Sequence, residues 1–338
     1  MFNKMYINKQ NLINNLMRIK ADNPNTLVCA MVKANAYGVG LKQVVKSISG
    51  LVNFFGVVCF FEAKKVKKYC TNKILIVGAL ERGNIDPAFS YTCNSVKDVK
   101  YLTKKQQSIN IHLKINSGMN RYGFSSLSKF KKALKIISKS KLNLEGLYTH
   151  FATADNYADK QMKKFNNFIA LCKKMGFNPI IHSDNSAVNL IKNHHLNMVR
   201  IGFNLYNNNE LGFNSVAEIQ TKITQVNIVN KGELVGYNYR FVAPKSMRVA
   251  VLPIGYADGF DMHYIGLDLC VDGAMCKVLN ICMDCFMLDI TNTKLKKGDK
   301  IKILDKFNSL TKYANFSSTS EYEVMTKFSS LRARRIII

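Results

Sequence analysis

The sequence predicts an α/β protein, a (β/α)8 barrel followed by a mostly-β C-terminal domain, and three observations support this fold class. Eight short apolar runs alternate with longer stretches over the first two thirds of the 338-residue chain. Those longer stretches, such as Ser128–Ser138 and Lys160–Met175, carry apolar residues at helical spacing. Beyond residue 215, glycine-containing turns replace helices between the apolar runs.

The eight runs are rich in β-branched and aromatic residues, as buried parallel strands are. A succession of eight strand–helix units is typical of a closed barrel, and an open doubly wound sheet is the alternative. In chain order the runs are Leu27–Val32, Phe54–Phe60, Ile74–Leu80, Phe89–Cys93, Ile111–Ile115, Leu144–Phe151, Pro179–Ser183 and Met198–Leu205.

The second domain is predicted from further apolar runs separated by the turns Lys231-Gly232, Asp272-Gly273 and Lys297-Gly298-Asp299. Its expected strands are Ile223–Val229, Met247–Ile254, Leu267–Val271, Cys276–Ile290 and Lys300–Leu304. We therefore expect the barrel over residues 1–215 and the mostly-β domain over residues 216–338.

The net charge of +27 invites a nucleic-acid-binding interpretation. Most of the 49 basic residues are lysines, however, and they are scattered through predicted helices and turns. Specific contacts to nucleic acids favour arginine forks and aromatic stacking platforms. We therefore favour a solvated lysine-rich surface and expect no nucleic-acid partner.

Other features bear on the protein's location. No apolar run approaches the about eighteen residues of a membrane span, so we expect no membrane association. The N-terminal residues lack the apolar core of a secretory signal, and the nine cysteines are most simply reduced thiols of a cytoplasmic protein. Cys282-Met283-Asp284-Cys285 has the spacing of a ligand pair but no second pair, so we predict no metal site.

Polar residues stand at the C-terminal ends of the predicted barrel strands, the edge at which such barrels carry their chemistry. Taken singly, each has a structural explanation, such as a lysine reaching solvent, a hydrogen-bonded histidine or a helix cap. Gathered at one edge, they indicate a site in which a desolvated lysine is a nucleophile or base and the last two loops bind phosphate. The polar residues are Lys33, Lys114, His150, Ser186 and Arg200, and Gly202 lets backbone N–H groups approach an anion.

Nine blocks carry a resemblance that spans nearly the whole chain, in one order. They are Val32–Gly38, Lys114–Phe124, Tyr148–Asp155, Asn185-Ser186-Ala187, Val199–Tyr206, Val235-Gly236-Tyr237, Leu252–Gly259, Cys282-Met283-Asp284 and Tyr322-Glu323-Val324. With these blocks the sequence resembles the bacterial alanine racemases, fold-type III enzymes that depend on pyridoxal 5′-phosphate.

The resemblance implies interconversion of L-alanine and D-alanine by two bases, Lys33 and Tyr237, on opposite faces of the substrate. It implies a homodimer in which Tyr237 and Met283 of the second domain enter the partner's site, and a use in D-alanine supply for peptidoglycan. Arg200 would face the pyridine nitrogen, and Lys114 matches a lysine that is carbamylated in some relatives. The implied cofactor-binding residues are Lys33, Tyr37, His150, Ser186, Arg200, Gly202, Phe203 and Tyr322, and the implied substrate-binding residues are Arg121 and Met283.

The chain also departs from the family pattern. Gly38-Val39-Gly40 lacks a histidine, Leu279-Asn280 replaces Gly-Arg, and Leu331–Arg334 matches Arg-Val-Pro-Arg only loosely. The N-terminal strand that pairs with the β domain is expected to be shortened. The alternatives are a racemase of the same fold acting on another amino acid, such as serine or lysine, and a non-catalytic carrier of the cofactor. The second domain and Tyr237 argue against a carrier.

Overall fold

The computed structural model describes residues 2–183, 196–207 and 209–338, and the chain divides into two compact units. The barrel unit comprises Ile13–Lys33 and Val44–Leu205. The β unit comprises Met1–Leu12, Ala34–Gln43 and Tyr206–Ile338. Two short N-terminal pieces, residues 1–12 and 34–43, therefore group with the C-terminal part of the chain. The predicted boundary after residue 215 assigns both pieces to the barrel.

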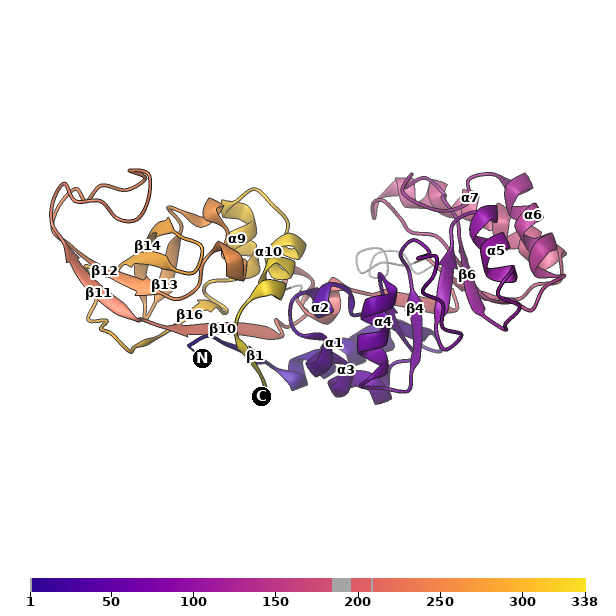
Figure 1. Cartoon of the computed structure of the whole chain (residues 1–338), viewed down its shortest axis with the longest axis horizontal. Helices are drawn as coiled ribbons and strands as arrows, with labels where there is room; N and C mark the ends of the chain where they lie inside the picture. Colours follow the sequence, from indigo (N-terminus) through magenta and orange to yellow (C-terminus); the bar gives the residue numbers. More distant parts are fainter. Residues whose placement is uncertain (1, 184–195, 208) are drawn as a thin grey trace. The chain divides into compact units, whose positions relative to one another are not determined.

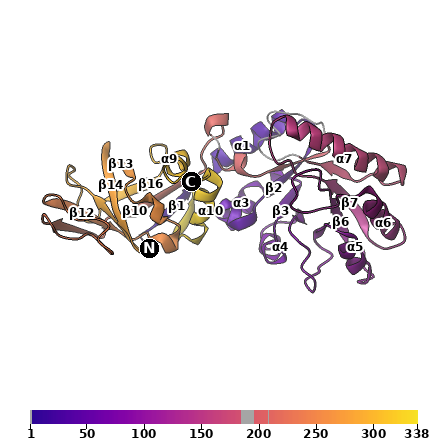
Figure 2. The ribbon, with the colours of Figure 1, turned by 90° about the horizontal axis from the view of Figure 1, so that it is seen from above.

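Among the described residues, eight parallel strands close into the predicted barrel, because the last strand pairs with the first (Figures 1 and 2). Every residue of β3 and β5 is buried, as expected for strands covered on both faces. The strands are β2 (Leu27–Met31), β3 (Phe54–Val57), β4 (Lys73–Ile76), β5 (Ser90–Cys93), β6 (Asn110–Lys114), β7 (Asn143–Tyr148), β8 (Ile180–His182) and β9 (Met198–Ile201).

Helices follow several of the strands, whereas β4 leads to β5 without a helix between them. The helices α4, α5, α6 and α7 lie around the outside of the barrel (Figure 2). Ser95, Ser126 and Asp155 begin α5, α6 and α7 by accepting a backbone N–H with their side chains. The two helices predicted at 128–138 and 160–175 are confirmed as α6 and α7. The helices are α1 (Lys9–Asp22), α2 (Lys33–Tyr37), α3 (Leu41–Ile48), α4 (Phe60–Lys67), α5 (Val96–Thr103), α6 (Leu127–Ile137) and α7 (Asn156–Lys174).

Two sheets form the β unit, which confirms its mostly-β character. A four-stranded sheet has the order β16–β10–β1–β17, and a five-stranded antiparallel sheet has the order β11–β12–β15–β14–β13. The strands of the first are β1 (Lys4–Ile7), β10 (Ala217–Lys222), β16 (Lys300–Leu304) and β17 (Arg334–Ile337). Those of the second are β11 (Gln225–Val229), β12 (Met247–Leu252), β13 (Asp268–Val271), β14 (Ala274–Ile281) and β15 (Phe286–Asp289).

The β unit differs from the prediction in three respects. The single strand expected over Cys276–Ile290 is wrong: β14 and β15 are separate strands joined by a turn in which the Cys282 N–H donates to the Cys285 carbonyl at 2.7 Å. No glycine or proline marks that turn, so the apolar pattern runs through it. The N-terminal strand β1 pairs on both sides, and the unpredicted helices α9 (Leu310–Phe316) and α10 (Glu321–Lys327) precede β17.

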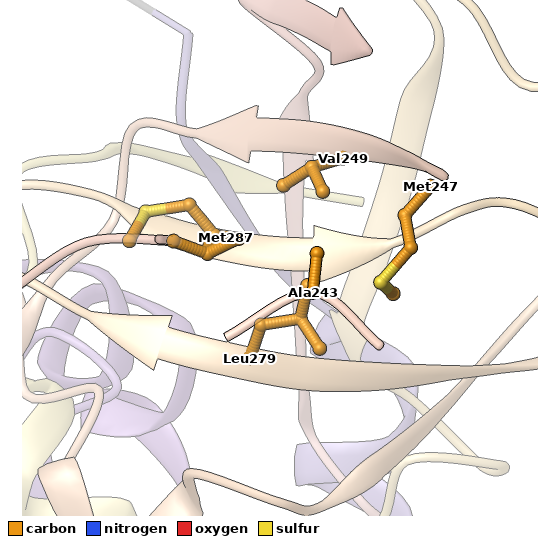
Figure 3. Close-up of a cluster of buried hydrophobic side chains, with 6 residues drawn as sticks. Ala243, Met247, Val249, Leu279 and Met287 are labelled. Carbon is orange, nitrogen blue, oxygen red and sulfur yellow. The ribbon is translucent and has the colours of Figure 1, made fainter. Parts of the chain in front are cut away.

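A buried apolar cluster ties the loop between β11 and β12 to the five-stranded sheet. Ala243 of the loop packs with side chains from β12, β14 and β15 (Figure 3). The buried members are Val235, Ala243, Met247, Val249, Leu279 and Met287. This packing restrains the segment that carries Tyr237.

Candidate active site

The carboxyl ends of the barrel strands bring together residues that lie far apart in the sequence. Lys33 follows β2, Lys114 ends β6, His150 lies two residues beyond β7, and Arg200 lies in β9. Each of the first three has its pKa lowered by the charge of Arg200. Because parallel strands end at one edge of the barrel, these side chains form a single cluster in the barrel unit.

Lys33 has the environment of a reactive amine. Burial is the largest cause that lowers its pKa, the charges of Arg121 and Arg200 lower it further, and Glu62 opposes them. A lysine with a lowered pKa carries more of the unprotonated amine near neutral pH. Lys33 can therefore serve as a nucleophile and as a base.

The backbone immediately after Lys33 is held in a left-handed turn. Ala34–Tyr37 have φ values between 51° and 55°, a conformation that costs about 1–2 kcal/mol for each non-glycine residue. Arg335 stabilises the end of this turn by donating to the carbonyls of Gly38 at 3.2 Å and Val39 at 3.0 Å. Val39, which stands where the family has a histidine, is fully buried and contributes its carbonyl to this contact.

Arg200 is a buried guanidinium with several fixed contacts. Its Nη2 donates to the carbonyls of Thr149 at 2.8 Å and Ser183 at 3.2 Å. Its Nη1 lies 2.5 Å from His182 Nδ1, and its Cζ lies 4.8 Å from the centre of the Tyr148 ring. These contacts fix both the position and the plane of the guanidinium.

His150 lies beside Arg200, with its Nδ1 3.4 Å from Nη2. Burial, followed by the charges of Arg200, Arg121 and two lysines, lowers the pKa of His150 well below its ordinary value. The imidazole is therefore neutral, and its Nδ1 can accept a hydrogen bond from the arginine, which has only donors.

Lys114 and Arg121 add further positive charge. The loop after β6 folds back because the Phe124 N–H donates to the Lys114 carbonyl at 2.8 Å. Burial, then Arg121, then Arg200 and Lys33 lower the pKa of Lys114 to about 7. Its Nζ also lies 5.6 Å from the centre of the Tyr148 ring.

The mouth of the barrel is thus strongly cationic. The charges that lower the pKa of His150 belong to four side chains, Arg200, Arg121, Lys114 and Lys33. Glu62 is the carboxylate whose charge acts on Lys33 within the described residues. Such a cluster is suited to an anionic ligand that carries phosphate or carboxylate groups.

Tyr37 and Tyr322, both predicted to bind phosphate, lie together in the β unit. Tyr37 is buried and packs on Tyr206 with the ring centres 5.2 Å apart. Burial, and then the proximity of Tyr322, raises the pKa of the Tyr37 hydroxyl. Tyr37 therefore remains a protonated donor, as a phosphate ligand requires.

The remaining predicted cofactor residues follow the last barrel strands. Gly202 and Phe203 are buried directly after β9, and the Gly202 carbonyl accepts from the Leu205 N–H at 3.0 Å. Ser186 lies outside the described residues.

Tyr237 and Met283 are exposed side chains of the β unit, with 70% and 59% of their surface accessible. Asn280 holds the loop of Tyr237: its buried Nδ2 donates to the carbonyls of Val235 at 2.9 Å and Tyr237 at 3.2 Å. Gly236 has a φ of 73°, and a Cβ there would lie 2.6 Å from that nitrogen. Asn280, which departs from the family pattern, therefore holds the backbone of the loop that carries Tyr237.

The segment Leu331–Arg334, which matches the family pattern only loosely, contacts a buried carboxylate through Arg332. Asp258 is fully buried and accepts two hydrogen bonds from the Arg332 guanidinium, both at 2.7 Å. Burial works to raise the pKa of Asp258, but the hydrogen bonds from Arg332 and from the Gly255 N–H outweigh it and lower the pKa.

Sequence reasoning missed three polar residues inside the barrel, His112, Glu145 and His182. They are buried and hydrogen-bonded to one another in a line that ends at Arg200. The available signal was an ionisable side chain within each of three mostly buried strands, β6, β7 and β8.

Comparison with known families agrees with this site. The family described as "Alanine racemase, N-terminal domain" matches residues 7–210, and "Alanine racemase, C-terminal domain" matches residues 216–337. The chain belongs to the alanine racemase family. The family resemblance predicted from the sequence is thereby confirmed, and with it an isomerase of the racemase type.

Similar alanine racemases come from several bacteria. That of Limosilactobacillus fermentum is 30% identical over 93% of this chain and 92% of its own, and that of Borreliella burgdorferi is 30% identical over 98% and 96%. The crystal structure of alanine racemase from Bacillus anthracis with bound L-Ala-P has a TM-score of 0.93 and 28% identity, covering 99% of this chain and 95% of that one.

Two further observations concern the described residues. No helix among them is both long and apolar enough to cross a membrane. No group of three or more His, Cys, Asp or Glu side chains among them could hold a metal ion.

Proposed function

We propose that this alanine racemase family member interconverts L-alanine and D-alanine with pyridoxal 5′-phosphate as its cofactor. The observation that carries the proposal is a lysine of lowered pKa, Lys33, at a barrel mouth lined by Lys114, Arg121 and Arg200. Lys33 would hold the cofactor through its unprotonated amine, and the cations would suit the cofactor's phosphate and the substrate carboxylate. The names of the relatives favour alanine as the substrate.

The residues present fit this cofactor in the chemistry of their donors. Lys33 would supply the amine, and Arg200 would face the pyridine nitrogen with a guanidinium that donates hydrogen bonds without losing its proton. His150, neutral and beside Arg200, supports that guanidinium. When bound, the cofactor supplies an electron sink for the charge left on the α-carbon. We assign the phosphate to Tyr37, Ser186, Tyr322 and the backbone of Gly202 and Phe203.

Two bases account for proton removal from one face of the substrate and return to the other. We assign them to the Nζ of Lys33 and the hydroxyl of Tyr237. The lowered pKa of Lys33 supports its part, because the amine must be unprotonated to take the α-proton. Arg121, and Met283 through its backbone N–H, are assigned to the substrate carboxylate.

We propose a homodimer in which the domain beginning at residue 216 supplies Tyr237 and Met283 to the partner's site. Both side chains are exposed, and the same loop region exposes further large apolar side chains, which is typical of an interaction surface. These are Leu234, Tyr239 and Val242.

A mixing experiment tests the shared site. Lys33→Ala and Tyr237→Phe chains are each expected to be inactive. Mixed and allowed to exchange, they should recover about one quarter of parent activity, since half the dimers are hybrids with one intact site of two. No recovery, with exchange verified by mass, would contradict a shared site.

An absorbance spectrum tests the cofactor and its lysine. Parent protein incubated with pyridoxal phosphate should show a visible band that borohydride abolishes, and Lys33→Ala should not show it. An unchanged band in Lys33→Ala would overturn the assignment of Lys33.

Substrate choice is tested by polarimetry with L- and D-alanine, serine and lysine. Turnover of serine or lysine in preference to alanine would support the alternative of another amino-acid racemase. We further propose that the reaction supplies D-alanine for peptidoglycan in the cytoplasm, which rescue of a D-alanine auxotroph would test.

A further inference from the structure

A line of buried hydrogen bonds runs through the barrel interior and ends at Arg200. Lys73 Nζ lies 2.7 Å from Glu145 Oε1, and Glu145 Oε2 lies 3.1 Å from His112 Nε2. His112 Nδ1 lies 2.8 Å from His182 Nε2, and His182 Nδ1 lies 2.5 Å from Arg200 Nη1. His112 and His182 are fully buried, while Glu145 and Arg200 are 7% and 5% exposed.

The chemistry of the two ends fixes the direction of every hydrogen bond in this line. Arg200 has only donors, so His182 must accept at Nδ1 and carry its proton on Nε2. That proton points to His112 Nδ1, which must therefore accept, leaving the His112 proton on Nε2. The Glu145 carboxylate, which has only acceptors, receives it. Moving the proton of His182 to Nδ1 would set it against an N–H of Arg200, and moving the proton of His112 to Nδ1 would set it against the N–H of His182.

The surrounding residues leave room for this arrangement and hold it. A Cβ on Gly146 of β7 would lie 2.0 Å from His112 Nδ1, so the ring occupies the space that the glycine leaves open. The Tyr148 ring stacks on His182, with the ring centres 4.7 Å apart and 12° between the planes. The His112 ring therefore lies directly against the backbone of β7, and the His182 ring lies against the Tyr148 ring.

The charge states agree with the direction of the bonds. Burial lowers the pKa of His112, against the opposing effect of Glu145, and burial followed by Arg200 lowers that of His182 well below its ordinary value. Burial works to raise the pKa of Glu145, but hydrogen bonds from His112, Lys73 and Ser90 outweigh it and bring the pKa to about 2. Near neutral pH the line therefore consists of one carboxylate and two neutral imidazoles.

We infer that Glu145 is a positioning residue that, with Arg200 at the other end of the line, holds the tautomers of His112 and His182 and thereby orients the guanidinium of Arg200. The line transmits orientation rather than protons, because arginine does not give up its own proton. The consequence for catalysis rests on the proposed role of Arg200 beside the pyridine nitrogen, whereas the tautomers do not depend on that role.

The first test observes the tautomers directly in the full chain without added cofactor. Nitrogen-15 NMR of histidine-labelled protein, with the six histidines assigned by single substitutions, should show His112 and His182 neutral and protonated on Nε2 from pH 6 to 8. A proton on Nδ1 of either ring in the parent protein would overturn the inference, whatever the cofactor results.

The second test removes the acceptor. Glu145→Leu leaves the His112 Nε2 proton without its acceptor and should mix the tautomers of His112, whereas Arg200 keeps the proton of His182 on Nε2. With pyridoxal phosphate and alanine added, transamination per racemisation should rise at least threefold. Glu145→Gln keeps an acceptor oxygen and should retain the parental tautomers and ratio. Glu218→Leu is the matched control, since Glu218 also lies 2.7 Å from a lysine, Lys302, but outside the line.

Parental tautomers and an unchanged ratio in Glu145→Leu would refute the role of Glu145. If that variant does not fold, Glu145→Asp withdraws the carboxylate by one methylene, and the same two readouts decide. Correct tautomers in a protein that binds no cofactor would instead count against the proposed function alone.

Discussion

Replacing Gly146 by alanine tests whether the barrel interior holds the His112 ring where the buried hydrogen bonds require it. The added Cβ would lie 2.0 Å from His112 Nδ1 and 2.4 Å from its Cε1, whereas real Cβ contacts essentially never fall under 3.0 Å. The φ of Gly146 lies outside the left-handed region, so alanine adds no backbone strain there. The ring itself must move by roughly an ångström, the difference between 2.0 and 3.0 Å.

The size of the effect follows from three contributions. Overpacking a tight interior costs about 1–3 kcal/mol. Separating His112 from His182 leaves buried nitrogens unpaired, at a further cost of about 1–3 kcal/mol. Alanine offsets about 0.4–1 kcal/mol of this loss, because it lowers the conformational entropy of the unfolded chain. We therefore expect Gly146→Ala to lower the free energy of unfolding by about 1–6 kcal/mol, because the first two contributions outweigh the third.

Urea unfolding followed by far-UV circular dichroism measures this loss. Gly50→Ala is the matched control, because nothing lies within 4 Å of a Cβ at Gly50. In a His112→Ala background the penalty of Gly146→Ala should shrink, since the clashing ring is gone. Equal midpoints for the two glycine variants, or a penalty undiminished without the ring, would refute the reasoning.

Three further predictions concern the site. Between pH 7 and about 10.4 the cofactor-free folded chain binds fewer protons at Lys114 than the unfolded chain does, because its folded pKa is lowered to about 7. The free energy of unfolding should thus rise with pH across this window, and Lys114→Met should flatten the rise in urea titrations at each pH. Arg200→Glu should raise transamination over racemisation, measured by pyruvate release, because a carboxyl group at the ring nitrogen strengthens the electron sink; an unchanged ratio would count against the role of Arg200. Asn280→Ala removes the side-chain hydrogen bonds to the carbonyls of Val235 and Tyr237 and should cut kcat/KM for alanine by about tenfold, equivalent to about 1.4 kcal/mol, whereas exposed Asn227→Ala should not.

Much of the barrel could be predicted because its strands are covered on both faces. Most of the strands are then short runs rich in apolar residues, and α6 and α7 show helical periodicity without reference to the rest of the fold. The β unit was less predictable, because β1 and β17 depend on partners from opposite ends of the chain. The hairpin between β14 and β15 carries no glycine or proline that would reveal it.

Part of the candidate site could also be predicted from the sequence. Lys33, Lys114, His150 and Arg200 could be grouped from the sequence alone, since parallel strands in a barrel end at one edge and each residue closes or follows a strand. The lowered pKa of Lys33 was also foreseeable from burial at that edge.

The sequence by itself therefore determined the barrel, the lysine at its mouth and the family, because apolar periodicity and short motifs are local properties. Only the tertiary structure decided that Glu145, His112 and His182 form one line to Arg200, and that Asn280 holds the loop of Tyr237. The physical reason is that a hydrogen bond depends on the position and direction of its donor and acceptor within a fraction of an ångström. Residues far apart in the sequence acquire that geometry only when the whole barrel or sheet has closed around them.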